Sequence, residues 1–211
     1  MTSTLARSLI ALVALCFAIA GPAAAQDSEK EIGYVSQKAF LGAKGHRVTG
    51  ESEDLKYRTE VWSNETVRTG AQGMTNLRFL DKTKLQVSSS SEVVLDRFVY
   101  DDDSDTGEMA MTFTKVAFRF ITGRMSNKDG FKLRTPTVAI GIRGTDFKVR
   151  VASDGTTTVS VLEGEVEVTP LGGGRGASIG EGQSAIGTAT GVAASAGDAV
   201  GSGINMESNR Y

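Results

Sequence analysis

The sequence is poor in the residue types on which most site chemistry depends. Its 211 residues include one histidine, one cysteine, one tryptophan and three prolines. A single cysteine excludes a disulfide framework, a zinc knuckle and a paired-thiol redox motif, because each needs at least two. One histidine leaves little room for histidine-based catalysis. The 23 basic residues are offset by 25 acidic ones, which argues against nucleic acid as the main partner, since phosphate binding requires a concentrated surplus of Lys and Arg.

Near the N-terminus lies an unbroken apolar run over residues 9–20. Arg7 precedes it, a Gly-Pro pair follows it, and three alanines end at residue 25. This pattern predicts a secretory signal peptide, residues 1–25, cleaved before Gln26. The run is too short to cross about 30 Å of hydrocarbon. We therefore expect a periplasmic or secreted protein without stable membrane insertion after cleavage.

Short alternating apolar segments fill the region from residue 28 to about residue 186. Apolar side chains at every second position, separated by turn residues, are typical of β-strands. The turn at 81–83 predicts a hairpin, and the imperfect alternation over 112–121 predicts one strand with a bulge. No stretch after the leader keeps a helical period for three turns. The sequence therefore predicts an all-β fold of many short strands, as a sandwich, a roll or a short solenoid.

Residues 187–211 differ from the rest, because they are rich in Gly, Ala and Ser and carry only scattered apolar side chains. Such a segment cannot bury enough surface to offset the cost of ordering it. We expect a flexible tail, or alternatively a partner-binding segment that orders on contact. Residues 26–59 are expected to form lead-in strands before a main β domain over 60–186.

The acidic stretch 101–105 is the first candidate for chemistry. It places carboxylates at the first three ligand positions of a calcium loop, but Gly107 comes one place late and Thr112 stands where a glutamate belongs. A solvated acidic turn is the better interpretation. Weak calcium binding stays open, and we expect no metal or cofactor elsewhere.

The other candidate site residues also have structural interpretations that involve no chemistry. His46 lies in a polar stretch and is expected in an exposed loop, because no nucleophile elbow accompanies it. Tyr57 and Trp62 would suit an aromatic sugar platform, although alternation places at least one of them in the core. Glu163 and Glu165 are predicted on one face of a strand, where a carboxylate pair would suit acid–base work. None of these supports a catalytic assignment.

The most constrained stretch is 135–147. Gly141 and Gly144 bracket Arg143, which indicates a sharp turn or a close approach of the backbone. If Arg143 is buried it needs a carboxylate of matching geometry. The carboxylates that would serve are Asp146, Glu163 and Glu165. We favour this structural interpretation, a pinned strand crossover, over display of Arg143 to an anionic ligand or partner.

The string at 134–147, Arg-Thr-Pro-Thr-Val-Ala-Ile-Gly-Ile-Arg-Gly-Thr-Asp-Phe, resembles the signature of the FecR domain. Further blocks resemble the family in the right order, at 67–70, 77–85, 158–168 and 180–183. Lys82 replaces the turn glycine that is usual in the family. The candidate interaction residues within the signature are Pro136, Gly141, Arg143, Gly144, Thr145, Asp146, Phe147, Glu163 and Gly164.

The resemblance implies a periplasmic β-rich domain that binds rather than catalyses. In the namesake regulators, a cytoplasmic segment controls a sigma factor, one helix crosses the membrane, and this domain senses an outer-membrane transporter. This chain shows neither that segment nor a lasting span, so we expect direct sigma-factor regulation not to carry over.

We expect instead an exported, non-catalytic module that contacts an envelope or outer-membrane protein through strand edges and loops, in a sensing, adaptor or assembly role. The alternatives are an envelope glycan as ligand, a glycan-cleaving activity, and a structural or adhesive role at the surface.

Overall fold

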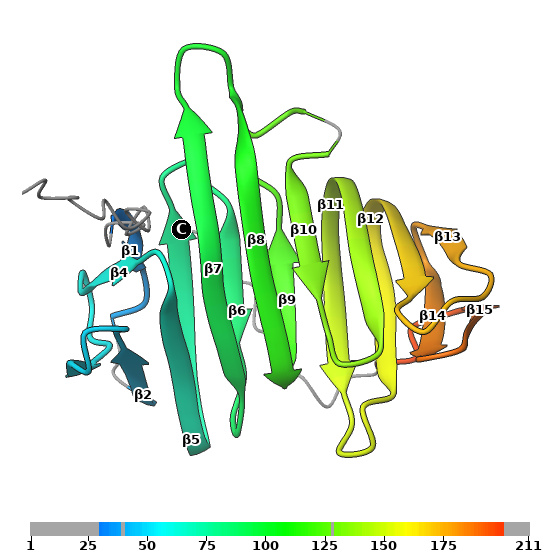
Figure 1. Cartoon of the computed structure of the whole chain (residues 1–211), viewed down its shortest axis with the longest axis horizontal. Helices are drawn as coiled ribbons and strands as arrows, with labels where there is room; N and C mark the ends of the chain where they lie inside the picture. The colour runs from blue at the N-terminus through cyan, green and yellow to red at the C-terminus, as the bar shows by residue number, and fades with distance from the viewer. Residues whose placement is uncertain (1–29, 39–40, 128, 201–211) are drawn as a thin grey trace, which may run out of the picture.

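The computed structural model describes residues 30–38, 41–127 and 129–200, which form strands and turns without a helix (Figure 1). No helix in these ranges is therefore long and apolar enough to cross a membrane. The predicted signal peptide lies outside them. The strands are β1 (Glu31–Val35), β2 (Leu41–His46), β3 (Ser52–Asp54), β4 (Glu60–Trp62), β5 (Glu65–Phe79), β6 (Lys84–Val87), β7 (Glu92–Asp101), β8 (Thr106–Lys115), β9 (Ala117–Ile121), β10 (Phe131–Arg134), β11 (Val138–Val151), β12 (Thr157–Pro170), β13 (Ala177–Gly180), β14 (Gln183–Thr188) and β15 (Gly191–Ala196).

Three long strands, β5, β11 and β12, change partners midway and so join two layers. The first part of β5 pairs with β2 and β7, and its last part pairs with β1 and β6. Likewise β11 pairs first with β10 and then with β9, while β12 pairs first with β14 and then with β13. The first layer therefore runs β3-β2-β5-β7-β8-β10-β11-β12-β13, and the second runs β4-β1-β5-β6-β9-β11-β12-β14-β15. The all-β prediction is confirmed, and the architecture is a sandwich rather than a solenoid.

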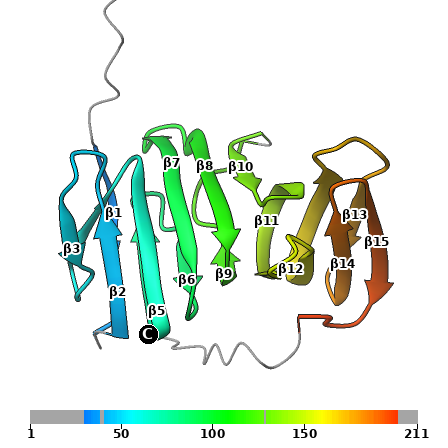
Figure 2. The same cartoon turned by 60° about the horizontal axis from the view of Figure 1, so that its bottom comes forward.

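The sheet also closes on itself. The short strand β10 pairs in parallel with β8 and antiparallel with β11, which completes a ring of hydrogen-bonded strands through β7, β5, β6 and β9. In Figure 1, β6 and β9 lie behind β7 and β8. Figure 2 shows the N-terminal strands at one end of the molecule and β13–β15 at the other.

The core lies between the layers, and its largest fully buried side chains are phenylalanines. Phe113 of the first layer stacks on Phe118 of the second, with ring centroids 3.9 Å apart. Phe120 of the second layer meets Phe131 of the first edge-on, at 5.8 Å. Alternation explains this arrangement, because the buried residues of each strand face inward and their neighbours face solvent.

The predicted hairpin at 81–83 is confirmed, since β5 and β6 pair on either side of it. Its turn is held by the buried carboxylate of Asp81, which accepts hydrogen bonds from the Thr83 amide at 3.0 Å and hydroxyl at 2.6 Å. Burial raises the pKa of Asp81. Lys82 adopts a left-handed φ of 74°, so the turn keeps the conformation that glycine favours although lysine is present.

Two boundaries predicted from the sequence are wrong. Residues 112–121 are not one bulged strand, because the chain passes from β8 in the first layer to β9 in the second at Val116, which breaks the alternation. The tail does not begin at 187 either, since β14 and β15 carry the second layer to Ala196. Small side chains suffice there, because strand pairing uses backbone groups. Residues 201–211 of the predicted tail lie outside the described residues.

Candidate interaction site

The signature stretch forms a corner where β11 and β12 cross together from one layer to the other. Gly144 and Gly164 have φ values of 56° and 85°, in the left-handed region that side chains disfavour. A Cβ atom at Gly164 would lie closer than 3.0 Å to the carbonyl oxygen of Gly144. At Gly141, which is half-buried, a Cβ would come no closer than 3.8 Å to its neighbour Glu167. Gly164 is therefore required by both its conformation and a close approach, whereas Gly141 is not.

Asp146 is paired with Arg119, which the sequence analysis did not identify. The guanidinium donates to both carboxylate oxygens, at 2.8 and 2.5 Å, and the two side chains are 19% and 15% exposed. This pair raises the pKa of Arg119. Arg143 is exposed and forms no ion pair within the described residues. The interpretation of Arg143 as a buried partner of Asp146, Glu163 or Glu165 is therefore wrong. The crossing places the arginine in the first layer and Asp146 in the second.

Two residues beside Asp146 hold the corner to the core. The Thr122 hydroxyl accepts a hydrogen bond from the Thr145 amide at 2.6 Å and donates one to the Thr145 carbonyl at 2.9 Å. Phe147 is fully buried and packs against Phe118 and Phe120. The corner is thus a pinned strand crossover.

Pro136 lies at the opposite end of the first half of β11, in the turn that follows β10. It is exposed, and the turn is closed by a hydrogen bond from the Thr135 amide to the Val138 carbonyl at 2.9 Å. The buried Thr135 hydroxyl lies 2.8 Å from that of Thr157. This contact ties the β10–β11 turn to the start of β12.

Glu163 and Glu165 do not share a face, which corrects the predicted carboxylate pair. Glu163 lies opposite Asp146 in the second layer, and Glu165 lies opposite Arg143 in the first. The left-handed bend at Gly164 separates them. Glu165 accepts a hydrogen bond from the Ser178 hydroxyl.

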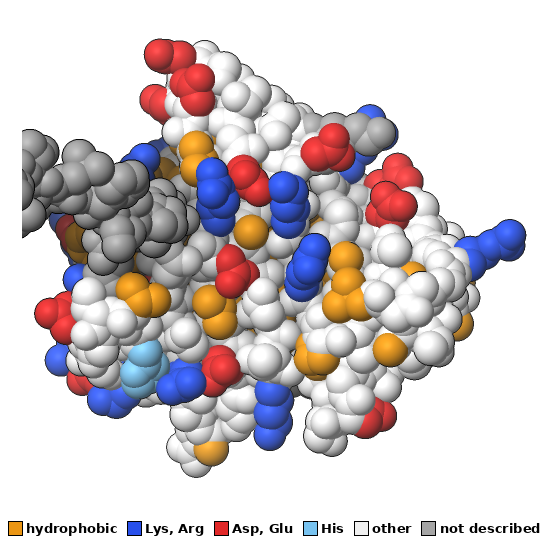
Figure 3. Space-filling view, in the orientation of Figure 1, with side chains coloured by type: hydrophobic (Ala, Val, Ile, Leu, Met, Phe, Trp, Pro, Cys, Tyr) orange, Lys and Arg blue, Asp and Glu red, His pale blue; other side chains and the backbone are white. Residues whose placement is uncertain are grey.

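The acidic stretch is a self-satisfied turn at the tip of the β7–β8 hairpin, at the top of Figure 3. Asp101 accepts hydrogen bonds from the Asp103 amide at 3.0 Å and the Ser104 hydroxyl at 2.8 Å, which lower its pKa. Asp102 pairs with Arg124 at 3.3 Å. Among the described residues, no group of three or more potential ligands is arranged to hold a metal ion.

The aromatic and histidine candidates also lie in unsuitable settings. The Arg47 guanidinium carbon lies 4.3 Å from the centre of the Trp62 ring, so one face of this ring is occupied. Tyr57 is exposed, with Arg58 near its ring. His46 was expected in an exposed loop, whereas it is half-buried in β2 opposite Ser52 of β3.

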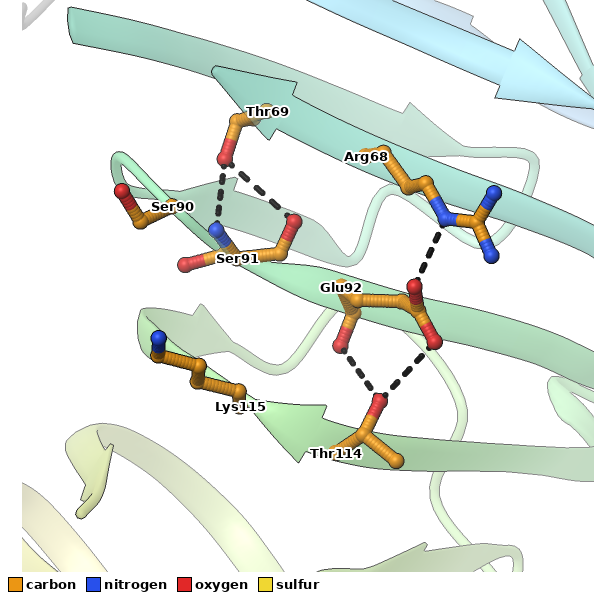
Figure 4. A pocket seen from close by; sticks show the side chains of 7 residues that line it. All are labelled: Arg68, Thr69, Ser90, Ser91, Glu92, Thr114 and Lys115. Carbon is orange, nitrogen blue, oxygen red and sulfur yellow. Dashed lines mark hydrogen bonds and ion pairs between the residues drawn. The ribbon is translucent and has the colours of Figure 1, made fainter. Parts of the chain in front are cut away.

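The outer face of the first layer carries hollows rather than a cleft. One of about 350 Å³ lies beside the bend of β5 (Figure 4). Within it, Glu92 accepts hydrogen bonds from Arg68 at 2.6 Å and from Thr114 at 3.2 Å, so these three side chains satisfy one another. Another, of about 230 Å³, lies over Ala139 and Gly141. Figure 3 shows charges of both signs mixed over this face, with scattered apolar side chains.

The C-terminal end of the sandwich ends in open strand edges. In the described sheet β15 pairs with β14 alone, and β13 pairs with β12 alone. Neither strand contains a charged residue or a proline. At the N-terminal end, β3 and β4 are three residues long and carry glutamate or aspartate. Short charged edges disfavour pairing with another chain, whereas a longer uncharged edge permits it. The sequence pattern does not reveal this edge, because the small residues at 191–196 are typical of a flexible tail.

This architecture is similar to that of known proteins. The family model described as FecR protein matches residues 65–167. Two crystal structures of a candidate anti-sigma factor from Parabacteroides distasonis match with a TM-score of 0.50, at 16% and 18% sequence identity. Each comparison covers 64% of this chain and 60% of the other, so this chain spans less than two thirds of that protein. No curated protein matches the chain. The matched segment runs from the start of β5 to the part of β12 beyond Gly164, and residues 65–167 are therefore identified as a FecR domain.

Proposed function

We propose that this chain is an exported, non-catalytic binding module of the cell envelope, which acts in signalling by recognising a protein partner. The match of residues 65–167 to the FecR family model supports a regulatory role. The description of the structural neighbours as a candidate anti-sigma factor agrees with such a role. The predicted signal peptide supports export of the domain to the periplasm or out of the cell.

The observation that carries this proposal is the open edge of β15. A partner in extended conformation adds to such an edge through backbone hydrogen bonds. Five of the six side chains in this strand are Ala, Gly or Ser, and they leave room for a neighbouring strand. The N-terminal edge lacks both the length and the neutrality that this binding mode requires.

Protein recognition is favoured over glycan chemistry by two observations. One face of the Trp62 ring is covered by Arg47, so the predicted sugar platform is incomplete. Glu163 and Glu165 lie in different layers, whereas glycoside hydrolysis needs two converging carboxyl groups about 5–9.5 Å apart.

The test is crosslinking of the tagged full-length chain in living cells, followed by hydrogen exchange of the purified chain with and without the partner obtained. We expect one recurrent envelope protein, and slower exchange of the amides of β15 when it is added. A lysine at the edge should hinder strand addition, so Ala194→Lys is expected to abolish the protection.

Ser52→Lys in β3 is the matched control, because it places the same side chain on the opposite edge. Recovery of wall fragments alone would support the glycan alternative, and recovery of the chain alone would support a structural role. Unchanged exchange of β15 in the presence of a bound protein would reject the edge as the binding site.

A further inference from the structure

A short strap, residues 197–200, lies across the outer face of the second layer. Two outward-facing serines bind its backbone. Ser184 accepts a hydrogen bond from the Ala199 amide at 2.9 Å, and Ser160 accepts one from the Val200 amide at 3.1 Å. Both serines are fully covered, with exposed fractions of 0% and 1%.

An ion pair and an apolar contact complete the binding of the strap. Asp198 pairs with Lys148 of β11 at 3.2 Å, and the strap residue Val200 is buried. The outer face of the second layer therefore binds an extended segment that runs across the strands. It does so through side chains that recognise backbone amides and a carboxylate.

The residues that bind the strap form one half of a longer polar row. Successive cross-strand neighbours along the second layer are Ser184, Ser160, Lys148, Arg119, Gln86 and Asn76, on β14, β12, β11, β9, β6 and β5. The strap contacts the first three. Neighbouring strands lie about 4.8 Å apart, so the remaining steps from β11 to β5 span about 14 Å, which about five extended residues would cover.

The half beyond the strap is basic and has an unused acceptor. In the adjacent row, Arg78 and Lys84 lie opposite each other on β5 and β6, and neither forms an ion pair within the described residues. Arg119 is the third cation and is paired with Asp146. The side-chain oxygen of Asn76 is buried without a hydrogen-bond partner in the described structure. The carboxylates of this row, Asp146 and its neighbour Glu163, lie on β11 and β12. The positive excess is therefore concentrated at Arg78 and Lys84 on β5 and β6, and the Asn76 oxygen lacks a donor.

We propose that this half of the polar row, bordered by Arg78 and Lys84, binds an extended acidic segment of a protein partner. The inference rests on the proposed function in that the ligand is a protein, but it uses a different surface from the β15 edge. The strap displays the binding mode: backbone amides meet outward polar side chains, and a carboxylate meets a cation. Charge complementarity selects the acidic class of ligand.

The test is a fluorescence polarisation titration of the full-length chain with a labelled peptide of alternating Asp and Ser. We expect binding that weakens as salt is raised. Charge reversal by Lys84→Glu should raise the Kd about tenfold. Lys84 is exposed, so this variant is expected to fold, and Arg78→Glu tests the half-buried neighbour.

Arg134→Glu is the matched control, because it reverses an exposed cation on the other layer; its Kd should stay within about twofold. Absence of binding, or an equal loss with Arg134→Glu, would overturn the proposal. Binding that requires removal of residues 201–211 would assign the surface to the chain's own C-terminal segment instead. Loss of peptide binding together with normal protection of β15 by a partner would reject this inference and leave the proposed function intact.

Discussion

The two places where strands cross between the layers are built differently. Near the N-terminal end, β5 crosses with β2 paired to it on both sides of the bend, at Thr69 and at Met74, and Gly70–Gln72 at the bend are exposed. A Cβ atom at Gly70 would come no closer than 3.7 Å to another segment, at the Gly42 carbonyl. At the other crossing, β11 and β12 bend together, and Gly164 lies directly against Gly144. The first crossing is open and the second is tight.

Both crossings coincide with blocks of the family signature. The Arg68-Thr69-Gly70 block lies at the bend of β5, and Arg143-Gly144-Thr145 lies at the bend of β11. A threonine fixes each bend. The Thr69 hydroxyl donates a hydrogen bond to the Ser88 carbonyl at 2.6 Å, and the Thr145 amide donates one to the Thr122 hydroxyl. These blocks therefore specify how the strands change layer. Binding groups are therefore better sought on the edge and the outer face than at Arg143.

The largest expected effect separates the tight crossing from the open one. Gly164→Ala should destabilise the protein by about 3 kcal/mol, because it adds a left-handed side chain and an overpacked contact. Gly70→Ala should change stability by less than about 0.5 kcal/mol. Urea unfolding of the two variants measures the difference, and equal losses would contradict the comparison.

The second prediction concerns the ion pair beside the tight crossing. Asp146→Ala leaves the partly buried Arg119 without its carboxylate and should cost about 2 kcal/mol. Arg143→Ala, at an exposed unpaired side chain, should cost less than about 0.5 kcal/mol. Thermal unfolding of both variants is the measurement. A large loss on changing Arg143 would show that this arginine is structural after all.

The third prediction concerns the hairpin into which β5 runs after the open crossing. Lys82 has a left-handed φ of 74°, which costs a lysine about 1 kcal/mol more than a glycine. Lys82→Gly should therefore stabilise the protein by about that amount. Lys84→Gly, in the adjoining strand, is the control and should destabilise it. If urea unfolding shows no stabilisation of Lys82→Gly, the lysine side chain makes a contact that compensates for its left-handed φ.

The smallest effect is a pH dependence from the same hairpin. Burial raises the pKa of Asp81 above its ordinary value of 3.8, so its stabilising contribution is complete below that value and is lost as pH rises through the raised pKa. Asp81→Asn removes this loss. As pH rises from 3.8 through the raised pKa of Asp81, the variant should gain stability relative to the wild type.

Asp154 is the control, because the Thr156 amide lowers its pKa. Its contribution is present above 3.8 and is lost as pH falls through the lowered value. The free energies of unfolding of Asp81→Asn and Asp154→Asn, measured against pH, should therefore change relative to wild type in opposite directions. Parallel curves would contradict the assignment for Asp81.

Alternation predicted the fold class because each strand has one inward face, as in the Lys84–Val87 segment. The Arg119–Asp146 pair was beyond reach, because its members are 27 residues apart and meet through the register of β9 and β11. The last strand was missed for another reason. Its side chains are small, and its position depends on backbone pairing and on the strap contacts at Ser160 and Ser184. Local patterns reveal periodicity, whereas the change of layer depends on long-range pairing.

The three strands that serve both layers also determine how the molecule loses its structure. Because β5, β11 and β12 each place one half in either layer, neither layer can separate while the other stays intact. Closure of the ring by β10 adds a further link between distant parts of the chain. The sandwich is thus a single cooperative unit. A defect at one corner is transmitted to strands of both layers, and a half-folded form with one layer detached is not open to this chain.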